Sequence, residues 1–351
     1  LHVWRLPYAQ ARKSFHSLRK PMDGPGPFTF RRAHLFENGD LLAIYEGFGL
    51  VKLRKDSTPF WAFTRAAHHD LAVNPAGQIV VLSRRARIVQ RLDPDEPALL
   101  DYVSWLKPDG ELVRDLSLLE AFERSKYASV LEGMRTSGDI FHTNTVKVLD
   151  GRHEKKDPAF ARGNLLISVL HLDTVAIVDP EKQQVVWAKK GSWSKQHEPV
   201  LLESGNMLVF DNNKFGKHSR VVEFDPLTMK EVWSYQGGKD GPFFSAECGV
   251  ARRLPNGNTL IIESLNGRAF EVTPKKKIVW EYYNPYRAGE NAELIATLFD
   301  VVRFGPDFPL GWIDEAGEEE REPDVGEGPV PSRAATGAAP TSSSSPSPSS
   351  P

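Results

Sequence analysis

The stretch "GNLLISVL" (163–170) has two close counterparts further along the chain, "GNMLVFDN" (205–212) and "GNTLIIES" (257–264). Each begins with Gly-Asn, a turn signal, and continues into a run of residues that favour strands. A proline-containing turn and a segment ending on tryptophan follow every time, with a period of about 46 residues. The second half of the chain is therefore built from a repeated β-rich unit.

Two weaker copies precede these three, at 37–63 and 74–106. Each copy has room for about four short strands separated by Gly, Asn, Asp and Pro turns. A four-stranded unit that repeats every 40 to 50 residues is typical of a propeller blade. The sequence predicts an all-β protein, a six-bladed β-propeller of which five blades are visible. Residues 291–308 are the candidate start of the sixth blade.

The predicted propeller spans residues 29–312. Residues 1–28 form an N-terminal segment, which can be truncated because the chain starts at Leu1 rather than at methionine. Residues 115–134 have apolar side chains at helical spacing and predict a helical insertion between the second and third blades. Residues 313–351 are acidic and then rich in Ser and Pro, so they predict a disordered tail.

The overall composition excludes several classes of protein. A 351-residue chain with 40% hydrophobic and 26% charged residues is long enough for a sizeable core, and a net charge of -2 predicts no nucleic-acid partner. Cys248 is the only cysteine, which excludes an internal disulfide and a multi-cysteine zinc site. No apolar run is long enough to span a bilayer, so a membrane anchor is possible only through a missing N-terminus.

Histidines recur where the first strand of each predicted blade begins. Innermost strands line the central channel of a propeller, so residues at that place should converge on one axis. The residues found there are His34, His68, His69, His142, His197 and the pair Glu247-Cys248. We expect these histidines to meet at one mouth of the channel.

Three kinds of ligand suit such a group of imidazoles. Neutral rings can hold a metal ion, protonated rings can hold an anion, and one ring can act as a nucleophile. Asp70 and Glu198 directly follow two of the histidines, but adjacent strand residues point to opposite faces, which argues against metal coordination. Lys214, Lys217 and Arg220 follow nearby and favour an oxyanion.

The chain resembles the bacterial arylsulfotransferases of the β-propeller type over roughly residues 65–310. The resemblance rests on "HHDLAVNPAGQIVVLS" (68–83), "FHTNTVKVL" (141–149) and "QHEPVLLESGNMLVFDN" (196–212). It continues through "SRVVEFDPLTMKEVWSY" (219–235) and "RRLPNGNTLIIESLNGRAFEVTPKKKIVWEYYNPY" (252–286).

The resemblance implies transfer of a sulfuryl group from a phenolic sulfate donor to a phenol acceptor through a sulfohistidine, with no cofactor and no metal. It implies His197 as the nucleophile, with His69 and His142 as charge-stabilising and acid–base partners. It also implies a periplasmic or extracellular location. The chain departs from the family at Leu170, where an arginine is usual. His171 or Arg220 can substitute for that arginine, and together with Asn144 they are the expected substrate-binding residues.

Two other functions compete with this prediction. The first is a non-catalytic propeller that binds an anionic or phenolic ligand or a protein partner, which the leucine at position 170 favours. The second is a metal site built from His69, His142 and His197.

Overall fold

The computed structural model describes residues 2–15, 30–45, 48–238 and 243–313. Residues 16–28 of the predicted N-terminal segment and residues 314–351 of the predicted tail lie outside these ranges. No helix in the described ranges is both long enough and apolar enough to cross a membrane.

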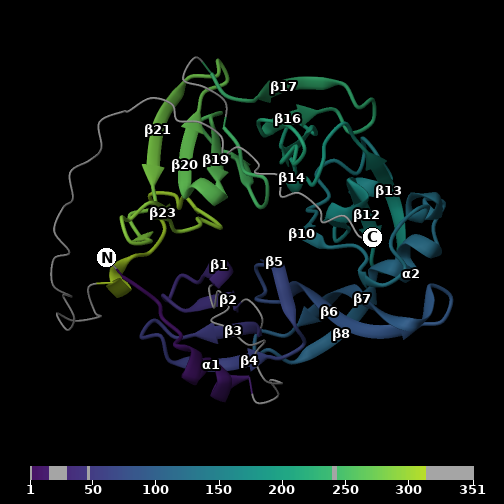
Figure 1. Cartoon of the computed structure of the whole chain (residues 1–351), viewed down its shortest axis with the longest axis horizontal. Coiled ribbons are helices and arrows are strands. Elements are labelled where there is room, and N and C mark those ends of the chain that lie inside the picture. Colours follow the sequence, from purple (N-terminus) through teal and green to yellow (C-terminus); the bar gives the residue numbers. More distant parts are fainter. Residues whose placement is uncertain (1, 16–29, 46–47, 239–242, 314–351) are drawn as a thin grey trace, which may run out of the picture.

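The described residues form five antiparallel sheets of four main strands, arranged around a common centre (Figure 1). We number these sheets as blades 1 to 5 in chain order. Blade 1 contains β1 (Phe30–Leu35), β2 (Leu41–Tyr45), β3 (Gly49–Leu53) and β4 (Pro59–Phe63). Blade 2 contains β5 (Ala67–Val73), β6 (Ile79–Val89), β7 (Asp93–Leu106) and β8 (Leu112–Ser117), and β9 (Gly138–Asp139) pairs in parallel with β7.

The next three blades contain the strong repeats. Blade 3 contains β10 (Thr143–Val148), β11 (Leu165–Val169), β12 (Thr174–Asp179) and β13 (Gln184–Lys190). Blade 4 contains β14 (His197–Leu201), β15 (Met207–Asp211), β16 (Arg220–Phe224) and β17 (Glu231–Tyr235). Blade 5 contains β18 (Val250–Arg253), β19 (Thr259–Glu263), β20 (Arg268–Val272) and β21 (Ile278–Tyr283). The prediction of an all-β propeller with five visible blades is confirmed.

Apolar layers between neighbouring blades hold the ring together. The second strands carry the Gly-Asn repeats, and all five residues of β11, β15 and β19 are buried. Side chains from both faces of these strands pack against the adjacent sheets, as Phe210 of blade 4 does with Ile261 of blade 5. Burial of one such side chain contributes about 1.5–3 kcal/mol. The repeat thus encodes strands that need a blade on each side.

Residues 291–308 do not form a sixth four-stranded sheet. Between β21 and residue 313 the described chain contains one short hairpin, β22 (Arg287–Ala288) with β23 (Leu294–Ile295). Leu298 and Val301 then pack on the free face of blade 5. The free face of blade 1 is covered by N-terminal side chains, among them Phe15, which follows α1 (Tyr8–Ser14). These two segments occupy the position that the sixth blade was expected to fill.

The predicted helical insertion is present but shorter than expected. Residues 112–117 form β8, because the backbone of Asp115 still pairs with Ser104 of β7. The Ser117 side chain then caps α2 (Leu118–Glu123), and a short 3-10 helix follows at Ala128–Leu131. Phe122 of α2 is fully buried between blades 2 and 3. The helical residues of this insertion therefore start at Leu118 rather than at residue 115.

Candidate functional site

A kink at the start of the innermost strands determines where the histidines point. His69, His142, Glu198 and Cys248 all have positive φ, between 49° and 60°. The register shifts at these places in β5, β10 and β14, as in a β-bulge. Backbone of this kind is strained for residues other than glycine and is often found near functional sites. It sends successive side chains of one strand toward different ends of the channel.

Four histidines line one cavity of about 300 Å³ near the channel axis, here termed the histidine cavity. Its complete lining comprises Arg31, His69, Arg84, His142, Leu170, His171, Lys195, His197, Lys214, Ala246, Glu247 and Cys248. The ring centroids of His69 and His142 are 4.7 Å apart, and those of His142 and His171 are 5.2 Å apart. Blades 2, 3 and 4 thus deliver His69, His142 and His197 to one place.

The contacts of His197 fix the position of its proton. Nδ1 lies 2.7 Å from Oδ1 of Asn212 and 3.0 Å from the carbonyl oxygen of Lys195, and both partners are acceptors. The amide of Asn212 is itself oriented, because its Nδ2 donates to the carbonyl oxygens of Ser245 and Cys248. Nδ1 of His197 therefore carries a hydrogen, and in the neutral ring Nε2 keeps a lone pair.

Burial keeps that ring neutral. It lowers the pKa of His197 from 6.5 to about 4, although the hydrogen bond to Asn212 opposes the shift. The side chain is almost fully buried. At neutral pH His197 therefore presents an unprotonated Nε2, which is the form that a nucleophile requires.

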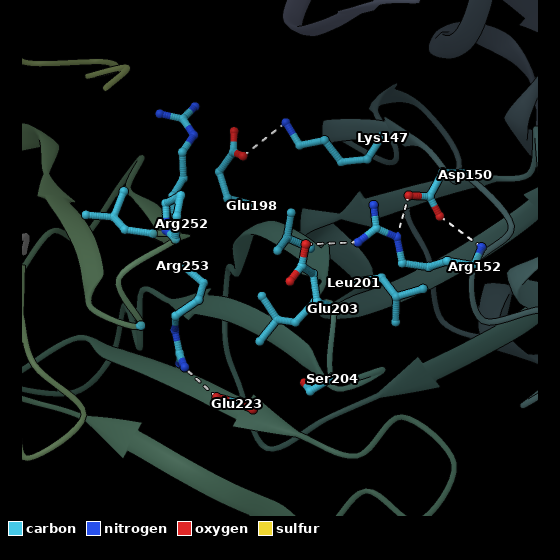
Figure 2. Close-up of a pocket in the computed structure, with 15 residues that line it drawn as sticks. Lys147, Asp150, Arg152, Glu198, Leu201, Glu203, Ser204, Glu223, Arg252 and Arg253 are labelled. Atoms are coloured by element: carbon cyan, nitrogen blue, oxygen red, sulfur yellow. Dashed lines mark hydrogen bonds and ion pairs between the residues drawn. The ribbon is translucent and has the colours of Figure 1, made fainter. Parts of the chain in front are cut away.

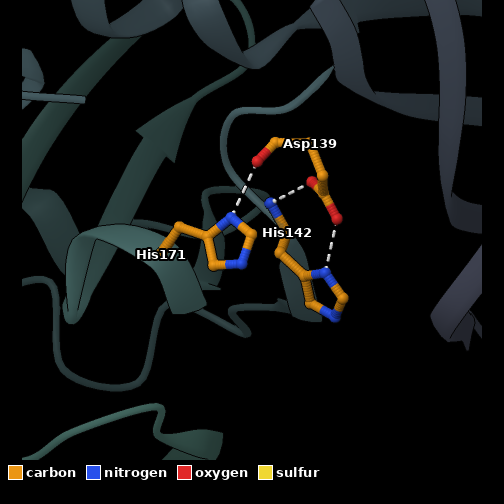
Figure 3. Close-up of side chains that lie close together, drawn as sticks. All are labelled: Asp139, His142 and His171. Carbon is orange, nitrogen blue, oxygen red and sulfur yellow. Dashed lines mark hydrogen bonds and ion pairs between the residues drawn. The ribbon is translucent and has the colours of Figure 1, made fainter. Parts of the chain in front are cut away.

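His142 and His171 share the residue Asp139, which lies in β9 (Figure 3). Nδ1 of His142 donates to Oδ2 of Asp139 at 2.5 Å, and Nδ1 of His171 donates to the main-chain carbonyl of Asp139 at 2.8 Å. Burial opposes ionisation of Asp139, but the hydrogen bond from His142 and the charge of Arg84 bring its pKa below the usual value. The carboxylate of Asp139 fixes the orientation of the His142 ring through its Nδ1 hydrogen.

His69 is backed by Asp101, which is fully buried. Its Nδ1 lies 2.8 Å from Nδ1 of His68, and Nε2 of His68 lies 3.6 Å from Oδ1 of Asp101. Because Nε2 of His68 faces a carboxylate, we assign its proton there, so that Nδ1 of His68 accepts from His69. Nε2 of His69 then carries a lone pair and has no hydrogen-bond partner among the described residues. Burial holds the pKa of His69 well below its usual value.

Cations dominate the rest of the cavity wall. Arg31, Arg84, Lys195 and Lys214 line it, whereas Glu247 is its only lining carboxylate in the described residues and is paired with Lys214 at 2.9 Å. Burial lowers the pKa of Lys195, and nearby cations add to this effect. A positive cavity of this kind attracts an anionic ligand.

Two of the three predicted substrate-binding residues line a cavity near the histidines, and the third does not. His171 lines the histidine cavity. Asn144 lines a small adjoining cavity with His69 and His197, and its Nδ2 donates to the carbonyl of Gln196 at 2.8 Å. Arg220 lies outside both cavities, on the third strand of blade 4, where Asp211 binds its Nε at 3.2 Å.

The prediction that His34 joins the other histidines at the channel mouth is wrong. It lies near the end of β1 rather than at its start, contacts the ring of Phe36, and is not among the described residues that line the histidine cavity. Arg31, at the start of the same strand, lines the cavity instead. Sequence reasoning also missed the roles of Asp139, Asn212 and Arg84, which support or line the cavity from other strands.

A ring of six charges lies beside the histidines, here termed the charge ring. Each of the five innermost strands supplies one member, and the segment after the hairpin supplies the last, so that the signs alternate in chain order. The members are Arg32, Asp70, Lys147, Glu198, Arg252 and Asp300. Asp70 and Glu198 point away from the histidines that precede them, as their adjacent positions predicted.

Every member of the charge ring has an oppositely charged partner. Arg32 contacts three carboxylates: Asp70 at 2.9 Å, Asp300 at 2.6 Å, and Glu198. Lys147 lies 2.9 Å from Asp70 and 3.1 Å from Glu198. Burial raises the pKa of Asp300 less than Arg32 and Arg252 lower it, so the carboxylate is ionised. Asp300 thereby joins blade 1 to blade 5 and closes the propeller.

A larger cavity of about 820 Å³ lies at the other end of the innermost strands (Figure 2). Lys147, Glu198 and Arg252 form part of its wall, so the charge ring separates it from the histidine cavity. Its other charged groups pair with one another, as Arg253 does with Glu223 at 2.7 Å. This second cavity offers a ligand little unsatisfied charge.

The arrangement suits an anion better than a metal ion. In the described residues, Asp139, His142 and His171 form the one group whose candidate ligand atoms lie within 4.8 Å of one another. It does not contain His69 or His197, which the metal alternative required. Oδ2 of Asp139 already accepts from His142, and Arg84 lies 3.6 Å away. The cations around it would repel a divalent ion.

Comparison with known proteins identifies one family. A family model described as "Arylsulfotransferase (ASST)" matches residues 35–285. A search among curated proteins gave no match.

Several solved structures are similar to the chain at low identity. A protein of unknown function from Bacteroides caccae is 14% identical, with a TM-score of 0.48 over 73% of this chain and 82% of that chain. A streptogramin B lyase is 11% identical, with a TM-score of 0.44 over 76% of this chain and 72% of that chain. The WD40 β-propeller domain of Doa1 is 9% identical, with a TM-score of 0.43 over 75% and 85%.

Proposed function

The chain belongs to the arylsulfotransferase family, and we propose that it transfers a sulfuryl group from a phenolic sulfate to a phenolic acceptor through a sulfohistidine at His197. The observation that carries this proposal is the oriented, neutral His197. Its Nδ1 hydrogen is held by two acceptors, and its ring lines a cavity rich in cations. Nε2 is thus available to attack sulfur.

In the first half-reaction, the lone pair on Nε2 of His197 forms a bond to sulfur. The bond between sulfur and the aryl oxygen breaks, and its electron pair stays on that oxygen. His142 donates a proton to the departing phenoxide, and the hydrogen bond from its Nδ1 to Asp139 holds the ring in place for this transfer. A phenol leaves, and the sulfuryl group remains on His197.

In the second half-reaction, the acceptor phenol occupies the same place. Neutral His142 takes its proton, the phenolic oxygen attacks sulfur, and the electron pair of the nitrogen–sulfur bond returns to Nε2 of His197. His69 lies edge-on to His142, with ring centroids 4.7 Å apart. Its unpartnered Nε2 offers a hydrogen-bond acceptor for the phenolic hydroxyl.

The transferred group carries negative charge on three oxygens, so positioned cations supply much of the stabilisation. Arg31, Arg84 and Lys195 are the lining cations suited to this task. In this scheme His171 and Asn144 border the substrate from blade 3. The proposed reaction uses phenolic substrates and takes place in the periplasm or outside the cell.

Leu170 favours a second candidate function. This apolar side chain lines the cavity where the family usually has an arginine. The site can therefore also bind a phenolic anion without catalysing a reaction. In that case the His197→Ala variant keeps the ligand affinity of the wild-type protein, and neither protein has any turnover.

Turnover assays distinguish the two candidates. Purified protein is mixed with 4-nitrophenyl sulfate, with and without a second phenol, and both nitrophenol and the sulfated acceptor are measured. We expect acceptor-dependent release of nitrophenol with matching formation of sulfated acceptor, and a loss of both in His197→Ala. Binding of 4-nitrophenyl sulfate without any release would reject the transferase.

A further inference from the structure

Arg84 occupies an unusual place in the histidine cavity. It comes from β6, the second strand of blade 2, whereas the histidines come from the beginnings of innermost strands or from the turn after β11. Two acids hold it: Nε donates to Oδ1 of Asp101 at 3.0 Å, and Nη2 lies 3.6 Å from Oδ2 of Asp139. The guanidinium is therefore fixed in position before any ligand binds.

One nitrogen of this guanidinium is left unsatisfied. Nη2 is buried and has no hydrogen-bond partner among the described residues, because 3.6 Å is too long for a hydrogen bond to Asp139. A buried donor without an acceptor costs about 1–3 kcal/mol. Such a cost at the wall of a cavity is explained if a ligand supplies the missing acceptor.

The two lysines of the cavity are held less rigidly. Lys214 is more than one-third exposed and is paired with Glu247. Lys195 makes a long contact of 3.4 Å to the carbonyl of Leu170, and burial disfavours its charged form. A guanidinium is planar, always charged, and matched to the oxygens of an anion.

We propose that Arg84 is the fixed anchor for an oxygen of the sulfuryl group, bound through Nη2. This inference rests on the proposed function for the identity of the anion. Asp139 also contacts His142, so the anchor and the proton donor are positioned by one carboxylate. Sulfur is thus held between Nε2 of His197 and the aryl oxygen that His142 protonates.

Inorganic sulfate is the probe that tests the anchor, because its binding requires no turnover. Its affinity is measured by titration calorimetry at low ionic strength for the wild type, Arg84→Gln and Arg84→Lys. Arg85→Gln is the matched control. Arg85 is the next residue on β6, pairs with Asp115 and stacks over Tyr102, and does not line the cavity.

We expect Arg84→Gln to bind sulfate at least about 10-fold more weakly than the wild type, since a charge-assisted hydrogen bond is lost. Arg84→Lys keeps a positive charge for Asp101 and Asp139, which guards against misfolding. It should lose a similar factor, because its amine is drawn between these two carboxylates. Arg85→Gln should stay within about twofold of the wild type.

Wild-type affinity in a folded Arg84 variant, with melting temperature as the check on folding, would overturn the anchor. The same outcome in both Arg84→Gln and Arg85→Gln, whether loss or retention, would also overturn it. A wild type that binds sulfate through Arg84 but releases no nitrophenol supports the anchor and rejects only the proposed transferase.

Discussion

The histidine cavity and the charge ring share three strands that give one residue to each, Arg31 and Arg32 of β1, His69 and Asp70 of β5, and His197 and Glu198 of β14, yet they differ in one respect. In the charge ring, Asp70 and Glu198 are both paired with Arg32 and Lys147. Nε of Arg32 and Oε1 of Glu198 lack a hydrogen bond of regular geometry, but each faces an opposite charge at close range. In the cavity, the carboxylate that faces Nη2 of Arg84 is 3.6 Å away, and Nε2 of His69 has no hydrogen-bond partner among the described residues. Ion pairs at close range hold the fold together, whereas the more loosely held groups line a cavity, and a register shift in each of these three strands lies where the two roles divide.

The largest expected effect is the loss of activity on replacing His197, whereas replacing its neighbour Glu198 should affect stability. Removing a nucleophile typically lowers kcat by about 10⁴-fold or more, so His197→Asn should abolish sulfuryl transfer. Its melting temperature should stay close to that of the wild type, because the side chain has no charged partner to abandon. Retention of about a tenth of the activity would contradict the assignment of His197.

Glu198→Ala should do the reverse and cost stability. Removing one partner of a buried ion pair costs about 3–5 kcal/mol, here because Arg32 and Lys147 would lose a carboxylate. Urea unfolding measures this loss. Glu203→Ala is the control, since Glu203 is exposed and its pair with Arg152 should contribute less than about 1 kcal/mol. Equal losses of unfolding free energy in the two variants would show that the charge ring is no more important for stability than a surface ion pair.

The protein should lose stability in acid because His197 is buried as a neutral ring. His197 has a pKa of about 4 in the folded protein and 6.5 as its ordinary value, so protons bind more tightly to the unfolded chain. Its contribution is complete above pH 6.5 and is lost as the pH falls toward 4, to a limit of about 3 kcal/mol. His197→Asn should flatten the dependence of the unfolding free energy on pH in this window. An unchanged slope would contradict a buried neutral ring.

Asn212→Leu should lower the rate without removing any group that touches substrate. Oδ1 of Asn212 accepts from Nδ1 of His197 and thereby selects the reactive tautomer. Misplacement of the His197 ring should lower kcat by roughly 100-fold. KM should change little, and circular dichroism checks the fold. A change confined to KM would show that Asn212 does not act through His197.

The smallest effect is expected at Arg220. Its guanidinium is held by Asp211 and lies outside the histidine cavity, so Arg220→Gln should leave kcat/KM within about twofold. A loss of more than tenfold would restore the sequence-based expectation that this residue binds substrate.

The sequence reveals the blades because each repeat carries its own strands, turns and apolar faces. It does not reveal how the ring closes. Asp300 pairs with Arg32 and Arg252, residues 268 and 48 positions away, and no local pattern marks these contacts. The expected sixth blade was therefore replaced by a segment whose structural role depends on distant charges.

The sequence predicts part of the candidate site, namely the residues that recur at equivalent places in the repeats. Equivalent places in the repeats predict that His69, His142 and His197 meet. Asn212 closes the repeat "GNMLVFDN" and could have been noticed as a polar end to a buried strand. Arg84 and Asp139 could not, because their roles depend on contacts between strands of different blades.

The central claim is that His197 carries the sulfuryl group between donor and acceptor. The most direct test is to quench a reaction of the protein with 4-nitrophenyl sulfate before acceptor is added, and to locate the modification by peptide mass spectrometry under mildly alkaline conditions. We predict a single sulfated peptide modified at His197, which disappears when a phenol is added. Release of nitrophenol with His197 unmodified, or with the label at another residue, would contradict the account.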